Sequence, residues 1–169
     1  MQIREKAHKD ATQCLDLLMQ VHQADGYPMF LPQDVPGFIT PDHEVAAWVG
    51  ESDGRIVGHV ALHRASVDPA LTAARRATGL PPERLAVVSR LFTSPAVRRA
   101  GVGRALLRHA TRHAAVLGQR AVLDVGQTTT APVALYESEG CERVAPLLLR
   151  VDATATLDLW VYVSPDTPS

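Results

Sequence analysis

The stretch from Leu85 to Leu117 constrains the fold most, because it joins a short apolar run to a long helical pattern through a glycine-rich turn. The run LAVVSRLF is rich in apolar and β-branched residues, which predicts a buried strand. Pro95 lacks a backbone N–H and ends that strand. Apolar residues then recur at helical spacing from Val102 onward. The sequence therefore predicts a strand, a turn and a helix in direct succession.

The turn has the spacing Arg-x-x-Gly-x-Gly, formed by Arg98, Gly101 and Gly103. The first N–H groups of a helix have no acceptor within it, and the helix dipole adds about half a positive charge there. Glycines let an anion approach those N–H groups without a Cβ in the way. A P-loop requires Lys-Ser or Lys-Thr after its last glycine, where this chain has Arg104, and the dinucleotide fingerprint requires a third glycine. The turn predicts anion binding of another kind.

Composition limits the classes of function. The chain has 169 residues, which suits one domain over 1–169, and its formal net charge of −1 gives no electrostatic support for nucleic-acid binding. Cys14 and Cys141 are too few for a disulfide framework and too far apart for a metal pair, so no metal site is predicted and a cytoplasmic location is expected. No apolar run reaches the ~18 residues of a membrane span.

The remaining periodicity predicts an element order of β-α-(loop)-β-β-β-α-β-α-β-β. The predicted strands are 2–6, 45–49, 56–63, 85–92, 120–125, 144–151 and 157–163, and the predicted helices follow Asp10, open at Val102 and cover 131–139. Residues 23–42 contain four prolines and three aromatic residues, which fits a binding loop or lid and a packed connection about equally. Residues 65–84 predict a helix-containing insertion or a mobile loop.

Two segments resemble motifs of the GCN5-related N-acetyltransferases (the GNAT superfamily). The segment 91–103, LFTSPAVRRAGVG, resembles motif A, and 134–140, ALYESEG, resembles motif B, although Cys141 stands where the family usually has Phe. The element order also matches, so the resemblance spans most of the chain. It implies a single-domain α/β (α+β) fold with a central mixed, mostly antiparallel sheet flanked by helices. It also implies an acetyl-CoA-dependent N-acetyltransferase acting on a primary amine of a small molecule or peptide.

The resemblance also implies which residues hold acetyl-CoA. They are Leu91, Phe92, Thr93, Arg98, Arg99, Ala100, Gly101, Val102, Gly103, Arg104 and Thr129. In the family a backbone N–H around Leu91 or Phe92 binds the acetyl carbonyl. Thr129 lies in the region where the family often has an asparagine that contacts the cofactor. A threonine hydroxyl can replace only one of the hydrogen bonds that the asparagine side-chain amide makes. The alternative for the arginines of the turn is a solvated basic surface.

Tyr136 occupies the motif B position that serves as general acid in many relatives. A phenol has a pKa of about 10 and protonates a thiolate only from close by. The alternative role is packing against the thiol end of the cofactor.

The general base is less well defined, because Ser89 and Arg90 stand where many relatives have a glutamate. His59 and His63 are four residues apart on a predicted strand, so they share a face, and histidine titrates near neutral pH. Each is also a candidate for a structural histidine. The other possibilities are Asp124, Glu44 or a water relay.

The acceptor is predicted to meet Tyr27, Phe30 and Asp34 in the Pro-rich loop, a combination that suits a cationic amine with an apolar body. Acidic residues that simply keep the loop soluble are an equal alternative. A different class of function, a non-catalytic acyl-CoA-binding sensor or assembly module, also fits the cofactor loop. The near-neutral charge disfavours charged tRNA as substrate. A homodimer is common in the family, although no stretch of this sequence establishes one.

Overall fold

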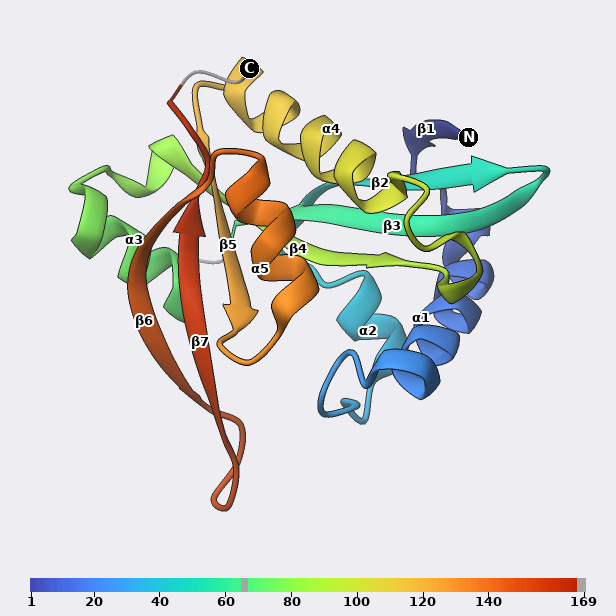
Figure 1. Cartoon of the computed structure of the whole chain (residues 1–169), viewed down its shortest axis with the longest axis horizontal. Helices are drawn as coiled ribbons and strands as arrows, with labels where there is room; N and C mark the ends of the chain where they lie inside the picture. The colour runs from blue at the N-terminus through green and yellow to red at the C-terminus, as the bar shows by residue number, and fades with distance from the viewer. Residues whose placement is uncertain (65–66, 167–169) are drawn as a thin grey trace. The chain divides into compact units, whose positions relative to one another are not determined.

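The computed structural model describes residues 1–64 and 67–166, whose strands form a seven-stranded mixed sheet in the order β1-β2-β3-β4-β5-β7-β6 (Figure 1). The strands are β1 Gln2–Glu5, β2 Glu44–Ser52, β3 Arg55–His63, β4 Leu85–Thr93, β5 Arg120–Gly126, β6 Glu142–Arg150 and β7 Thr156–Val163. β4 and β5 pair in parallel, whereas β1–β2, β2–β3, β5–β7 and β6–β7 are antiparallel. The predicted fold class is confirmed.

The helices account for the rest of the regular structure. They are α1 Ala11–Asp25, α2 Val35–Ile39, α3 Pro69–Thr78, α4 Val102–Val116 and α5 Thr130–Ser138, with 3₁₀ turns at His8–Asp10, Pro82–Arg84 and Pro95–Val97. The Pro-rich loop thus contains the short helix α2, and the segment 65–84 contains α3, although residues 65–66 lie outside the described residues. Within the described ranges, no helix combines the length and the apolar character that a membrane crossing needs.

The chain divides into two compact units, each of which is described by itself. The first unit comprises Met1–His63 and Ser89–Ala110, and the second comprises Arg64–Val88 and Thr111–Ser169. The division falls inside both β4 and α4. In the first unit, α1 packs on β3, and its core joins apolar side chains of α1, α2, β2 and β3 to Phe92 of β4.

Gly58 of β3 allows α4 to lie close to the sheet in the first unit. A Cβ built on Gly58 would be 2.6 Å from Leu106 Cδ1 and 3.1 Å from Val102 Cγ1. Both side chains belong to the start of α4 and are buried. The absence of a side chain at Gly58 therefore permits the close approach of the first turns of α4 to β3.

In the second unit, α3 packs on β5, β6 and β7. The long β6–β7 hairpin is the orange-red to red pair of strands in Figure 1. The Asp68 carboxylate caps α3 by accepting a hydrogen bond from the N–H of Ala70 at 2.9 Å. Pro69 occupies the first turn, and Gly79 ends the helix in the left-handed conformation. These local signals explain why an alanine-rich segment forms a helix here.

Asp10 does not cap α1 as its sequence position suggests. Its carboxylate accepts hydrogen bonds from Arg4 at 2.7 and 3.0 Å and from the N–H of Ala7 at 2.7 Å. The Asp10 side chain is only 3% exposed. The hydrogen bonds from the Arg4 guanidinium lower the pKa of Asp10 to about 2, against the opposing effect of burial.

We expect Asp10→Asn to lower the free energy of unfolding at pH 7 by about 2 kcal/mol, because a folded-state pKa below the ordinary value stabilises the native state. The stabilisation is fully present above about pH 4 and is lost as the pH falls toward 2. Urea unfolding of wild type and variant between pH 7 and pH 2 measures it. Asp16→Asn, at an exposed position of α1, is the control. If wild type and Asp10→Asn differ in free energy of unfolding by the same amount at pH 7 and at pH 2, the ion pair with Arg4 is not the cause.

Candidate active site

The predicted anion-binding turn is built in the first unit between β4 and α4. The hydroxyl of Ser94 accepts a hydrogen bond from the N–H of Ala96 at 3.2 Å and so starts the 3₁₀ turn Pro95–Val97. Arg99 and Gly101 then adopt positive φ angles of 62° and 77°. The chain reverses sharply at these residues and enters α4.

Gly101 is the residue from which α4 begins. Its carbonyl accepts the first helical hydrogen bond, from the N–H of Ala105 at 3.0 Å. The N–H groups of Val102 and Gly103 precede that bond and have no acceptor within the helix. Gly101 is exposed, and a Cβ built on it would meet no atom within 4 Å. The open space at Gly101 suits the approach of an anionic group such as a pyrophosphate to the start of α4.

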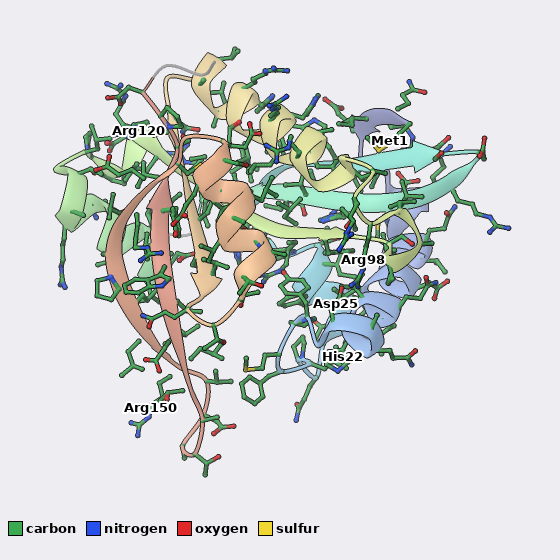
Figure 2. The ribbon with its side chains drawn as sticks, viewed as in Figure 1. Met1, His22, Asp25, Arg98, Arg120 and Arg150 are labelled. Carbon is green, nitrogen blue, oxygen red and sulfur yellow. The ribbon has the colours of Figure 1, made fainter. Side chains whose placement is uncertain are left out.

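Arg98, predicted to bind the cofactor, is engaged within the protein. Its guanidinium forms an ion pair with the carboxylate of Asp25, the last residue of α1 (Figure 2). The two side chains are 49% and 37% exposed. An ion pair this exposed contributes little to stability, so a phosphate could displace the carboxylate at small cost.

We therefore expect Asp25→Asn to strengthen acetyl-CoA binding by about 2- to 5-fold, because it removes the carboxylate that competes for Arg98. Calorimetric titration at low and high salt measures the change, which should diminish as salt increases. In an Arg98→Ala background the same substitution should have no effect. Unchanged or weaker binding in the single variant would show that Arg98 does not contact the cofactor phosphates.

β4 carries an irregularity just before the predicted acetyl-binding residues. Arg90 has a φ of 55°, which is unusual for a residue with a side chain and more so inside a strand. Its guanidinium lies 3.6 Å from the ring centroid of Phe38, and its Nε donates to the Phe38 carbonyl at 2.8 Å. Phe92 is buried in the core. Leu91 and Thr93 on either side are partly exposed.

The geometry of His59 argues against the predicted role of general base. The ring is fully buried, and burial lowers its pKa to about 4. Nδ1 lies 2.8 Å from the carbonyl oxygen of Arg90, and Nε2 lies 3.4 Å from Nζ of Lys6. Both ring nitrogens therefore have protein partners, and neither is available to accept a proton from an amine.

His63 is equally unsuited to the predicted role. It is 2% exposed, and burial lowers its pKa to about 3. Its ring contacts that of His43 edge-on at 4.7 Å between centroids, and its Nε2 has no hydrogen-bond partner among the described residues. Its burial keeps the ring neutral and away from solvent, which argues against a role as general base. Glu44, another candidate, is committed to an ion pair with Lys6 at 2.8 Å.

The three residues predicted for the acceptor have different surroundings within the first unit. Tyr27 is half-buried, with its ring centroid 6.2 Å from that of Phe92 in β4. Phe30 is 43% exposed. The carboxylate of Asp34 caps α2 by accepting from the N–H of Gly37 at 3.0 Å. Asp34 therefore has a structural role, and Tyr27 is the one of the three in ring contact with β4.

Tyr136 lies on α5 in the second unit and is 8% exposed. Its ring meets that of Tyr162 edge-on at 5.8 Å between centroids. The Tyr162 hydroxyl donates to Glu137 at 2.8 Å and accepts from Arg143 at 3.1 Å. Glu137 and Arg143 form an ion pair at 3.2 Å, so these three side chains anchor α5 to β6 and β7. The orientation of Tyr136 is set by this anchored helix.

Thr129 and Asp124, two further predicted site residues, also belong to the second unit. Thr129 precedes α5 and is exposed, and its N–H donates to the Gly126 carbonyl at 3.0 Å. Its side chain makes no capping hydrogen bond to α5. Asp124 is exposed on β5. The hydrogen bond from the Thr129 hydroxyl to the cofactor stays a prediction.

Three residues that matter for the first unit's site were not predicted from the sequence as site residues. They are Lys6, Gly58 and Arg90. Only Gly58 carried a usable signal, because a glycine inside a strand marks close approach of another element. The others act through partners more than 30 positions away, which local patterns cannot reveal.

The mixed sheet and the glycine-rich turn into α4 are the features of the acetyltransferase class that the sequence resembles. The model of the acetyltransferase (GNAT) family matches residues 11–141. The chain therefore belongs to the GNAT acetyltransferase family. No curated protein sequence matches the chain.

Solved structures share the fold across nearly the whole chain. An N-acetyltransferase from Staphylococcus aureus Mu50 matches with a TM-score of 0.73 and 18% identity, over 98% of each chain. The ribosomal-protein-S18-alanine N-acetyltransferase from Escherichia coli matches with a TM-score of 0.70 and 17% identity, over 99% of this chain and 95% of its own. The protein smu.2055 from Streptococcus mutans UA159 matches with a TM-score of 0.74 and 17% identity, over 99% of this chain and 100% of its own.

Proposed function

We propose that the chain is an N-acetyltransferase that takes its acetyl group from acetyl-CoA and transfers it to a primary amine of a small molecule or peptide. The observation that carries the proposal is the turn at Arg99 and Gly101, which leads into α4 and has open space where a Cβ of Gly101 would lie. It stands at the end of the helix whose first N–H groups have no acceptor within the helix. Family membership supports the acetyl transfer itself.

The chain's own residues would hold the donor as follows. The N–H groups of Val102 and Gly103 would bind the pyrophosphate, with Arg98 and Arg99 as charge partners. The backbone N–H of Leu91 would bind the carbonyl oxygen of the acetyl group as a preorganised donor. Acetyl-CoA, when bound, supplies an acetyl group activated by a thiol leaving group.

Acetyl transfer forms a bond from nitrogen to the acetyl carbon while the bond from that carbon to sulfur breaks. One proton must therefore leave the amine, and one must reach the sulfur. We assign the second proton to the hydroxyl of Tyr136, in keeping with the motif B resemblance. His59, His63 and Glu44 are poorly suited to accept the proton that leaves the amine. We therefore assign water as the acceptor of that proton.

A thiol-release assay with acetyl-CoA and a panel of primary amines tests the proposal. Release that depends on one class of amine supports it and begins to identify the acceptor. Acetyl-CoA binding without release from any amine would instead favour the sensor or assembly module.

A further inference from the structure

The positive φ of Arg90 needs neighbours that hold it in place. A residue with a side chain is strained at such a φ and persists there only where its surroundings determine it. Arg90 is held on its side chain by Phe38. It is held on its main chain by His59, whose Nδ1 lies 2.8 Å from the Arg90 carbonyl oxygen.

The contacts at the two ends of the His59 ring determine its tautomer. A carbonyl oxygen only accepts hydrogen bonds, so the Nδ1 that faces Arg90 must carry the proton. The Lys6 ammonium only donates, so the Nε2 that faces it at 3.4 Å must be unprotonated. Both contacts require the same neutral form of the ring.

Lys6 is itself fixed. Its ammonium group also contacts Glu44 Oε2 at 2.8 Å, Thr40 Oγ1 at 3.1 Å and the carbonyl of Ile39 at 3.3 Å. The Lys6 side chain is 8% exposed. The His59 ring is further held by stacking on Phe92, with 5.1 Å between centroids and 14° between planes. A buried polar chain therefore runs from Glu44 through Lys6 and His59 to the backbone of β4.

In a trans peptide the carbonyl and the following N–H point in opposite directions within one plane. Fixing the Arg90 carbonyl therefore also fixes the direction of the Leu91 N–H. We propose that His59 is a positioning residue, which donates from Nδ1 to the Arg90 carbonyl and thereby orients the Leu91 N–H toward the acetyl carbonyl oxygen. The inference rests on the proposed function for the identity of that ligand.

The first test reads the tautomer in the full-length wild-type chain by ¹⁵N NMR of the histidine rings. At pH 7 the inference requires His59 to be neutral, with Nδ1 protonated and Nε2 unprotonated. A ring protonated on Nε2, or on both nitrogens, would overturn it. This measurement needs neither substrate nor a variant that folds.

The second test compares His59→Asn with His59→Leu. The asparagine amide can place an N–H where Nδ1 lies and donate to Arg90, whereas leucine cannot donate. We expect His59→Leu to lower kcat by about 10- to 100-fold, since removing an oxyanion-type donor outright costs about 100-fold or more. His59→Asn should recover kcat to within about 5-fold of wild type, with an unchanged acid limb of the pH profile.

Each outcome of the comparison is informative. Equal losses in both variants would mean that the ring serves another purpose, and an unimpaired, folded His59→Leu would remove the positioning role. Acetyl-CoA affinity of each variant is measured in parallel by calorimetry and should stay within about 3-fold of wild type, because the pyrophosphate contacts are untouched. Failure of the wild-type chain to bind acetyl-CoA would instead refute the proposed function, whatever the tautomer.

Discussion

Replacing Gly101 by glutamate should reduce acetyl-CoA affinity by at least about 100-fold, because like charges brought together cost several kcal/mol. Gly101 starts α4, and its built Cβ points into open space. A glutamate there would place a carboxylate beside the N–H groups proposed to bind the pyrophosphate. The φ of 77° at Gly101 also makes any residue with a side chain unfavourable there. The control substitution must therefore be made at a glycine with a similar φ.

Gly118→Glu is the matched control. Gly118 follows the C-terminal end of α4, has a φ of 73°, and its built Cβ likewise meets nothing within 4 Å. The two substitutions thus impose the same charge and nearly the same backbone strain. Calorimetric titration should show a loss of binding only in Gly101→Glu. Retained binding in Gly101→Glu would mean that the turn does not hold the cofactor.

Tyr136→Phe should lower kcat by about 100- to 1000-fold, the range expected when a general acid is removed. Acetyl-CoA affinity should change by less than about 2-fold, since the phenol is not assigned to donor binding. Phenylalanine preserves the ring that packs against Tyr162, so the position of α5 should be retained. Steady-state kinetics and calorimetry on the same preparation separate the two quantities.

Tyr162→Phe provides the control for loss of a buried tyrosine hydroxyl. That hydroxyl bonds Glu137 and Arg143, so its removal should cost about 1–2 kcal/mol in stability. It should leave kcat near the wild-type value, because the Glu137–Arg143 ion pair still anchors α5 and the ring that meets Tyr136 is preserved. Full turnover in Tyr136→Phe would remove the acid assignment and leave a packing role for Tyr136.

Structural features that depend on residues close together in the sequence were predictable. The strand, turn and helix from β4 to α4 follow from an apolar run, a proline and spaced glycines. The β2–β3 hairpin follows from Asp53-Gly54, both of which adopt the positive φ that a tight hairpin turn demands. In each case the residues that decide the structure lie within a few positions of one another.

Features that depend on distant partners were not predictable. Nothing local to Arg90 indicates its positive φ, which His59 and Phe38 hold from 31 and 52 positions away. Histidine chemistry suggested a base at His59, whereas the burial of the ring and its contacts with Arg90 and Lys6, which argue against that role, come from distant parts of the chain. The sequence likewise gave no sign that the Asp34 carboxylate, predicted to meet the acceptor, caps α2. Function was inferred from residue type, whereas the role depends on tertiary contact.

Calorimetric titration with acetyl-CoA, paired with thiol release over a panel of amines, tests the central claim most directly. We expect micromolar binding of acetyl-CoA at the turn around Gly101, and thiol release with at least one class of primary amine. Absence of acetyl-CoA binding by the wild-type chain would contradict that claim.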